Sequence, residues 1–433
     1  MINFPYYLSL FKISQSSIIK YINHLLFILL SFALLLVSCS STKRFPNSES
    51  TENVDRTVYT NFSSVRVLLD ESDAAYHLSI QSPVYLYGND EKLAYIESGN
   101  TVECINDYNE VKLIISDKVF TADAFFMKPA DKETSVKFNG RGYKGNLKLV
   151  GLGGSIGIIN QLSLDDYVKG VVAKEMPIGK NSENFEALKA FSICVRTYTL
   201  KKISEGKSFY DLYDDTRDQV YGGLNAESPL SNRAVEESIN KILTYDGKIA
   251  SIYYHSTCGG RTESANNVFT KKEIPYMMGI KDGNSPNCNI SPKFEWKEIY
   301  SHNDIIKRLK RSSLIKSENF TIDDIYVKSR FNSGRANEMV FELVDEYGER
   351  KNVSIFGNKI RSIIRTASSK NILWSTLFDV SFTKNNLELI GNGFGHGVGM
   401  CQYGAISLSR NGWSFIDIIK HYFPGIEIKH LND

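Results

Sequence analysis

Between residues 62 and 160 the chain alternates apolar and polar positions with the two-residue period of a β-strand. Turn-forming Gly, Asn, Asp and Ser residues separate five short β-favouring runs, which read VRVLL, HLSI, VYLY, VKLII and LKLVG. Such runs between turn residues predict strands. Residues 61–160 are therefore expected to form a β-rich region, and we find no catalytic constellation in it.

After residue 160 the apolar residues recur at helical spacing. A first helix is predicted from about Asp165 to near Met176, because proline disfavours the helical conformation of the residue before it. Ser182 or Asn184 is the expected N-cap of a second helix. Its core-facing residues are expected at three- and four-residue spacing, namely Phe185, Leu188, Ser192, Val195 and Thr199.

Charged residues gather around the loop between these two helices. Glu175 stands on the last turn of the first helix, and Lys189 and Arg196 share one face of the second. This arrangement is typical of a charged cleft wall, but also of a solvated amphipathic helix. The spacing alone favours the solvated helix.

The rest of the chain mixes strand and helix patterns, so the expected fold class is α+β. A polar loop at 210–223 contains Asp214, Asp215, Arg217 and Asp218, which we interpret as a structural ion cluster rather than the border of a substrate groove. A helix over 231–243 with Ser231 as its N-cap and a strand over 248–256 are expected next. Residues 296–390 are interpreted as an architectural insertion, and two short helices are expected at 405–410 and 414–423.

Alternating glycines occupy residues 391–399 in the sequence GNGFGHGVG. In an extended chain all these glycines would lie on one face, where a flat ligand or another backbone could approach closely. The other face would carry Asn392 and His396. A phosphate-binding loop is not supported, since neither a preceding βαβ pattern nor a Walker lysine is present.

The composition excludes some classes of function. The 433 residues are 42% hydrophobic and 23% charged, as in an ordinary globular protein, and the net charge of +2 does not indicate nucleic-acid binding. The 24 tyrosines and 24 phenylalanines could stack on sugars, but aromatic residues more often fill cores.

The N-terminus has the pattern of an export signal. Lys12 and Lys20 precede an apolar run at 25–37, which is short for a spanning helix. The run ends in LVSC, which resembles a bacterial lipobox and predicts lipidation of Cys39. Residues 1–39 are thus expected to be a lipoprotein signal peptide, and polar residues 40–60 a flexible tether. An uncleaved membrane anchor is the alternative, and either places the remainder outside the cytoplasm, in the periplasm or at the cell surface.

Three residues in the middle of the chain are candidate metal ligands. His255 and Cys258 are three residues apart at the end of the predicted strand, and Cys288 lies thirty residues further on. They could hold a structural zinc ion with a fourth ligand. A Cys258–Cys288 disulfide is equally consistent with an exported protein, and unpaired thiols are a third interpretation.

Five stretches together resemble one family. In chain order they are LDDYVKGVVAKEMP, FEALKAFSICVRTYTL, DQVYGG, YYHSTCGGRTES and GNGFGHGVGMCQYGA. Their order and spacing resemble the SpoIID/LytB family over roughly residues 61–427. The family usually reads EALKAQAVAARTY where this chain has Phe191, Ser192, Ile193 and Cys194, a departure that concerns helix packing. The resemblance implies a mixed α/β catalytic domain over residues 161–430 with a glycan-binding cleft.

The resemblance also implies a chemistry. Proteins of this family resemble lytic transglycosylases that cleave peptidoglycan glycan strands, preferably peptide-free, between N-acetylmuramic acid and N-acetylglucosamine. Glu175 matches the single acid, whose pKa must be raised for proton donation, and Lys174 would oppose this unless it points away. Sugar-binding candidates are Lys189, Arg196, His255, His396 and Tyr403. No cofactor is required for this chemistry, and the expected partners are glycan strands, a cell-wall amidase and the membrane through the lipid anchor.

Two other functions are compatible with some of these residues. The chain could be a non-catalytic glycan-binding enhancer of an amidase, although a pure binder needs no acid at Glu175. It could also be a Cys–His peptidase that uses Cys401 with His396, or Cys258 with His255, but no flanking signature supports a peptidase.

Overall fold

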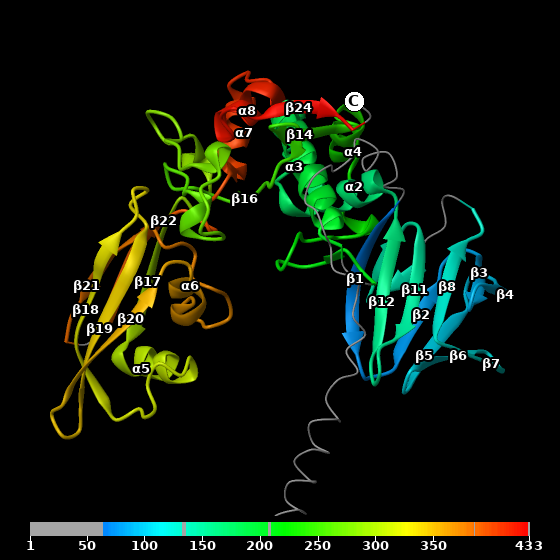
Figure 1. Ribbon diagram of the computed structural model, residues 1–433, viewed down its shortest axis with the longest axis horizontal. Helices are drawn as coiled ribbons and strands as arrows, with labels where there is room; N and C mark the ends of the chain where they lie inside the picture. The colour runs from blue at the N-terminus through cyan, green and yellow to red at the C-terminus, as the bar shows by residue number, and fades with distance from the viewer. Residues whose placement is uncertain (1–63, 132–135, 207–208, 385, 432–433) are drawn as a thin grey trace, which may run out of the picture. The chain divides into compact units, whose positions relative to one another are not determined.

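The computed structural model describes residues 64–131, 136–206, 209–384 and 386–431 (Figure 1). These residues all belong to one compact unit, which spans residues 57–433. The expected signal peptide, lipobox Cys39 and tether lie outside the described residues. Among the residues described, no helix is both long and apolar enough to cross a membrane.

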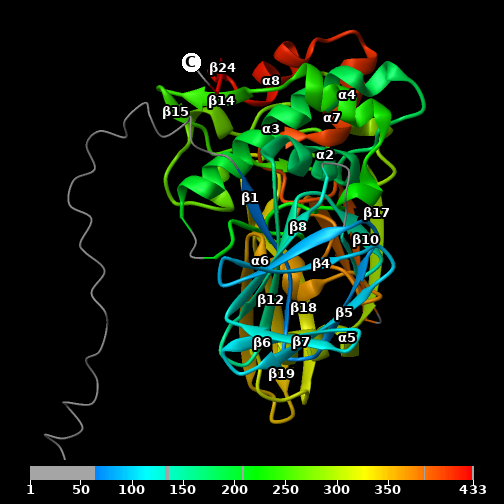
Figure 2. The same ribbon diagram turned by 90° about the vertical axis from the view of Figure 1, so that its right-hand side faces the viewer.

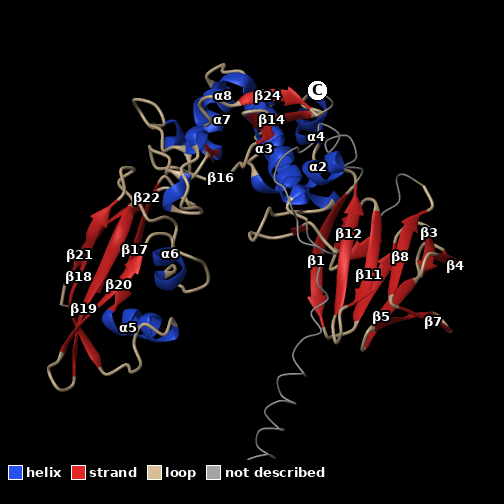
Figure 3. Ribbon diagram, viewed as in Figure 1, coloured by secondary structure: helices blue, strands red, loops and turns tan. Residues whose placement is uncertain are grey.

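Two antiparallel β-sheets make up the N-terminal part, as the alternating pattern predicted (Figure 3). The first sheet has the order β13 (Leu212–Tyr213), β1 (Val65–Ser72), β12 (Ile156–Leu162), β11 (Asn146–Gly151), β8 (Ala124–Pro129), β3 (Val84–Gly88) and β4 (Glu91–Ile96). The second has the order β10 (Arg141–Tyr143), β9 (Val136–Phe138), β2 (Tyr76–Ile80), β5 (Thr101–Asp107), β6 (Glu110–Ile115) and β7 (Lys118–Ala122). In the first sheet only β13 pairs in parallel, with β1. Alternate residues of both sheets contribute to one core, which also contains apolar residues of the following helices.

Helix α2 (Leu164–Glu175) follows β12 directly, and helix α3 (Phe185–Ser204) follows after a short 3₁₀ turn, η2 (Ser182–Asn184). Ser163 caps α2 by accepting a hydrogen bond from the amide of Asp166. Helix α3 is buried almost all round, which contradicts the solvated amphipathic interpretation. It contacts α2, α4 (Pro229–Glu237), α7 (Gln402–Arg410) and α8 (Phe415–Tyr422), which lie together in Figure 2.

Helix α4 differs from its prediction at both ends. Ser228 is the N-cap, and Ser231 is the third helical residue that completes the capping box. The helix ends at Glu237, and the expected last turn is instead strand β14 (Lys241–Tyr245), which pairs with β15 (Lys248–Ile249) and β24 (Glu427–His430). Partners distant in sequence therefore override the helical pattern here.

Residues 295–392 have a hydrophobic core of their own. One sheet has the order β17 (Glu295–Ser301), β22 (Asn386–Asn392) and β21 (Phe378–Phe382), and the other β18 (Phe320–Arg330), β19 (Ala336–Asp345) and β20 (Arg350–Phe356). Helices α5 (His302–Arg311) and α6 (Lys359–Ile364) pack against these strands (Figure 1).

The glycine stretch is not an extended strand. Four glycines take positive φ angles between 74° and 115°: Gly393, Gly395, Gly397 and Gly399. The expected close approach of another backbone is nevertheless present, since a Cβ on Gly399 would lie 2.0 Å from the carbonyl oxygen of Tyr253. The stretch leads into β23 (Met400–Cys401), which pairs in parallel with β16 (Tyr254–His255). Four short 3₁₀ turns complete the elements: η3 (Leu224–Ala226), η4 (Ala265–Asn267), η5 (Pro275–Met277) and η6 (Asn287–Ile290).

Candidate functional site

Glu175 is the last residue of α2 and is only partly exposed. Met176 follows in an extended conformation, so the helix ends where the proline rule places it. The Glu175 Oε1 atom accepts a hydrogen bond of 2.7 Å from the backbone N–H of Val220. This bond ties the carboxyl group to the loop at 210–223, which contains the DQVYGG stretch.

The environment of Glu175 favours its protonated form. Burial raises the pKa of the carboxyl group above its ordinary value of 4.5, and the N–H of Val220 and the side chain of Gln402 oppose this without cancelling it. Lys174 is exposed and does not contribute to the shift. A carboxyl group with a raised pKa is suited to donate a proton near neutral pH.

Unsatisfied buried polar groups surround this carboxyl. Gln402 is 4% exposed, and its side chain lies close enough to Glu175 to lower the pKa of that carboxyl group, although its Nε2 atom has no described partner with full hydrogen-bond geometry. Burial raises the pKa of Tyr254, and the nearby charge of Glu175 raises it further. The buried Tyr254 hydroxyl lies near the side chain of Gln219 but does not form a hydrogen bond of full geometry with any described residue. Gln219 accepts hydrogen bonds from Tyr167 and Thr199, while its own Nε2 has no described partner. Buried donors without acceptors cost free energy, so this region is built for something other than stability alone.

A second cluster lies where the glycine stretch meets the CGG turn. The buried side chains of Cys258, Asp282, Cys288 and Cys401 place their ligand atoms within 4.8 Å of one another. The sulfurs of Cys258 and Cys288 are 3.4 Å apart and both thiols are free, so these residues do not form the disulfide that was one alternative. Sequence reasoning missed Asp282 as a ligand and considered Cys401 only as a nucleophile.

The donor set fits a structural zinc ion. Four buried donors, three of them sulfurs, match the closed tetrahedral sites in which zinc has a structural role. Hydrogen bonds from Cys258 and Cys401 lower the pKa of Cys288 to about 4, so one thiolate is available without metal. Although burial opposes it, hydrogen bonds from His421, Tyr422 and the two thiols Cys258 and Cys288 lower the pKa of Asp282. These four side chains could hold the ion in the interior of the protein.

His255 is not part of this cluster, in contrast to the expected ligand set. Its Nδ1 lies 3.0 Å from the carbonyl oxygen of Val398, so Nδ1 carries the proton, and the buried Nε2 has no described hydrogen-bond partner. Burial and the neighbouring His396 and Arg335 lower its pKa well below 6.5. His255 is therefore a neutral interior histidine.

His396 lies beside His255, with ring centroids 5.6 Å apart. Its Nδ1 accepts a hydrogen bond of 3.1 Å from the amide of Val398. Burial, followed by the charge of Arg361, lowers the pKa of His396 to about 3, so this ring is also neutral. A neutral ring still offers a polar group to a ligand, but not a positive charge.

The structure separates the expected sugar-binding residues. Arg196 is 1% exposed and donates to the carbonyls of Ser238 and Lys241 and to Asp165, which does not fit the predicted contact with substrate. Lys189 pairs with Glu186 on its own helix and lies between the rings of Phe185 and Phe415. Tyr403, next to Gln402 at the start of α7, is partly exposed.

The peptidase alternative loses its geometric basis. Cys401 Sγ accepts hydrogen bonds from the backbone amides of Cys258 and Gly404, and burial raises the pKa of this thiol well above 9. Cys258 has a raised pKa for the same principal reason. A nucleophilic cysteine needs a lowered pKa and a nearby base, which neither thiol has among its described contacts.

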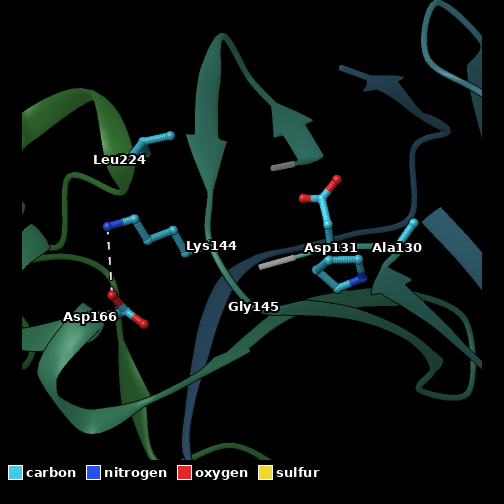
Figure 4. Close-up of a pocket in the computed structure, with 7 residues that line it drawn as sticks. Ala130, Asp131, Lys144, Gly145, Asp166 and Leu224 are labelled. Atoms are coloured by element: carbon cyan, nitrogen blue, oxygen red, sulfur yellow. Dashed lines mark ion pairs between the residues drawn. The ribbon is translucent and has the colours of Figure 1, made fainter. Parts of the chain in front are cut away.

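Two hollows among the described residues are lined by residues other than Glu175. One, of about 740 Å³, is lined by Pro129, Ala130, Asp131, Lys144, Gly145, Asp166 and Leu224 (Figure 4). Lys144 pairs there with Asp166 at 3.5 Å and also with Glu227, and so ties the turn between β10 and β11 to the first turn of α2. The other, of about 660 Å³, borders the loop at 210–223, where Asp215 pairs with Arg217 and burial raises the pKa of Asp214 to about 6.

Comparison with known proteins agrees with this geometry. Residues 153–245, which include Glu175 and Val220, match the family model described as Stage II sporulation protein, SpoIID. In this part the chain is similar to the SpoIID family. A second family model, described as a domain of unknown function (DUF8618), matches residues 270–399, which include the separate core of 295–392.

Individual relatives extend the SpoIID match. An uncharacterized protein of Brachyspira hyodysenteriae is 29% identical over 385 residues, which cover 86% of this chain and 95% of that protein. The amidase enhancer of Bacillus subtilis is 28% identical over 290 residues, 60% of this chain but only 39% of the enhancer. Stage II sporulation protein D of Bacillus amyloliquefaciens is 28% identical over 292 residues, 63% of this chain and 76% of that protein.

Proposed function

We propose that this chain is a cell-wall protein that cleaves peptidoglycan glycan strands by lytic transglycosylation, with Glu175 as its one acid and base. The observation that carries the proposal is the partly buried Glu175 carboxyl, whose pKa burial raises while the Val220 amide fixes one oxygen. The names of the SpoIID-family relatives support a cell-wall context.

The reaction needs only one carboxyl group. Protonated Glu175 gives its proton to the oxygen of the N-acetylglucosamine leaving group as the bond from C1 of N-acetylmuramic acid breaks. The resulting carboxylate then takes the proton of the C6 hydroxyl of the same muramic acid while that oxygen bonds to C1. The product is a 1,6-anhydro end, no water is consumed, and Glu175 ends protonated. A hydrolase would instead need a second carboxylate near the scissile bond.

The test is digestion of purified glycan strands, with and without stem peptides, followed by mass spectrometry. Wild-type protein should release anhydromuramic ends, and Glu175→Gln should lower the rate at least about 100-fold, as expected when a general acid is removed. Glu97→Gln, the same change at an exposed turn, serves as the matched control. Reducing ends in place of anhydro ends would contradict the transglycosylase.

One comparison favours a second candidate, a non-catalytic amidase enhancer. A relative with that name aligns over 60% of this chain. In this case both the wild type and Glu175→Gln would bind strands without cutting them, and both would increase the rate of a cell-wall amidase equally. The burial of an acid beside unpaired donors argues for catalysis.

We also propose that Cys39 is the lipid-bearing residue of an exported, membrane-anchored lipoprotein. The lipobox-like LVSC after an apolar run supports this. Cys39→Ser should abolish labelling by a radioactive fatty acid and release the protein from the membrane fraction. Unchanged labelling of Cys39→Ser would show that Cys39 is not the residue that carries the lipid.

A further inference from the structure

One face of the first β-sheet carries an array of aromatic rings that its core does not use. Strand β3 contributes Tyr85 and Tyr87, β4 contributes Tyr95, and β8 contributes Phe126. Their chain neighbours, such as Leu86 and Phe125, are fully buried on the other face, because successive side chains point to opposite sides of a strand. Tyr85 is directly opposite Tyr95, and Tyr87 opposite Phe126, so the four rings form one outward patch.

Three lysines alternate with these rings. The Nζ of Lys92 lies 3.7 Å from the ring centroid of Tyr85, that of Lys128 lies 4.3 Å from Tyr87, and that of Lys148 lies 5.2 Å from Phe126. We call these seven residues the lysine–aromatic face. The rings hold the ammonium groups by cation–π attraction. Because these lysine side chains are already held in place, binding a ligand costs less side-chain entropy than it would with freely moving lysines.

The surroundings of the face are polar. A shallow hollow of about 220 Å³ lies between Tyr87, Asp90, Phe126, Lys128, Asn146 and Gln161. Asp90 is its one carboxylate, while Asn146 and Gln161, which are opposite each other on β11 and β12, contribute amide groups. The face thus offers positive charge, ring surface and amide hydrogen bonds together.

We propose that the lysine–aromatic face binds a glycan strand whose sugars carry free carboxylates. Aromatic side chains pack on the apolar faces of sugars, ammonium groups pair with carboxylates, and amides bond to hydroxyl or N-acetyl groups. In peptidoglycan such carboxylates become free on muramic acid when the stem peptides are removed. The choice of glycan rests on the proposed function, and charge complementarity selects the peptide-free strand.

This face is separate from the family-defining part of the chain. Its strands β3, β4, β8 and β11 all precede residue 153, where the SpoIID match begins, and so also precede the second match at 270–399. A strand held here would keep the protein on the polymer between cleavage events. The face is thus a binding surface and takes no part in the proton transfers at Glu175.

Co-sedimentation of the full chain with insoluble peptide-free glycan tests this. All variants carry Glu175→Gln, so that cleavage does not destroy the matrix. Lys92→Glu with Lys128→Glu should lower the affinity at least about ten-fold, equivalent to about 1.4 kcal/mol. Lys112→Glu with Lys118→Glu, the same charge change on β6 and β7 of the other sheet, should leave it unchanged. When the glycan carboxylates are converted to amides, the affinity of the protein with the native lysine–aromatic face should fall to that of the Lys92/Lys128 double variant.

Several outcomes would overturn the proposal. Equal binding by both double variants, or binding that does not depend on the glycan carboxylates, would exclude the face. Binding to phosphatidylglycerol vesicles that depends on Lys92 and Lys128, without such a dependence for glycan, would assign the face to a lipid surface. Cleavage of short glycan fragments by the double variant with native Glu175 should stay at the wild-type rate, so a failure of the catalytic proposal is detected separately.

Discussion

The backbone amide of Val220 donates a 2.7 Å hydrogen bond to Oε1 of Glu175, across 45 residues of sequence. An amide N–H needs an acceptor lone pair, so in the neutral carboxyl group this oxygen accepts the bond and the other oxygen carries the proton. The bond therefore fixes both the position and the orientation of the acid. Because it also stabilises the carboxylate, it keeps the raised pKa from rising further.

Replacing Glu175 should change the pH dependence of stability. The folded protein raises the pKa of Glu175 above its ordinary value of 4.5, so between these two values the folded state binds more protons than the unfolded state. The free energy of unfolding should therefore fall as the pH rises through that interval. Glu175→Gln lacks this loss and should melt at a higher temperature than wild type near pH 8, by on the order of a few degrees. The difference in melting temperature between the two proteins should disappear near pH 4. A difference that is the same at all pH values would contradict the raised pKa.

Gln402 should act as a positioning residue for Glu175. Its buried side chain lowers the pKa of the carboxyl, so Gln402→Leu should raise that pKa. The alkaline limb of the pH–rate profile should then move to higher pH, with roughly two- to ten-fold more of the maximal rate retained there. Gln81→Leu, the same change at an exposed bend, should leave the profile in place. A fall in rate with no movement of the limb would indicate a purely structural role.

The cysteine–aspartate cluster should bind one zinc ion per chain. Cys288→Ala should lower the zinc content measured by atomic emission to less than about one tenth of wild type, because a closed site loses a thiolate ligand. Cys104→Ala removes a buried thiol of the second sheet and should keep full zinc content. Removal of zinc by a chelator should lower the melting temperature of wild type and leave that of Cys288→Ala unchanged. An equal zinc content in both variants would exclude the cluster as a site.

Arg335 should be a main determinant of stability around the glycine stretch. It is 1% exposed, and it donates hydrogen bonds to the carbonyls of Cys258 and Arg261 beside the buried Glu263. Arg335→Met should cost roughly 3–5 kcal/mol in the free energy of unfolding, since it leaves a buried carboxylate and two carbonyls without a cation. Arg335→Lys keeps the charge but not the planar fork, and should recover only part of the loss. Denaturant unfolding measures both variants, and Arg330→Met, on a partly exposed arginine of the same hairpin, is the control.

Sequence patterns correctly predicted the strands and helix ends that are set by local residue patterns. Strands β2 and β3 follow the two-residue alternation, and α2 ends just before Met176 and Pro177, as the proline rule predicts. Glu175 was identified from its motif, and the local rule that places it at a helix end is correct. The end of α4 was mispredicted because β14 finds its partner β24 almost two hundred residues later.

The site around Glu175 could be predicted only in part. Arg196 and Lys189 have the spacing of a charged wall, but the sequence does not show that α3 is surrounded by four other helices, which bury Arg196. Gln402 and Tyr254 gave no signal, since an isolated glutamine or tyrosine is not distinctive. The same applies to Asp282, which becomes a candidate ligand only because Cys258, Cys288 and Cys401 fold around it.

The sequence by itself determined the α+β class, the family motifs and the two helices that flank Glu175, the proposed acid. All of these depend on local rules of propensity, capping and proline geometry. Only the tertiary structure decided which carboxyl is buried, which cysteines meet, and that the glycines 393–399 turn rather than extend. Burial and ligand geometry depend on contacts between residues far apart in the chain, and such contacts leave no periodic trace in the sequence.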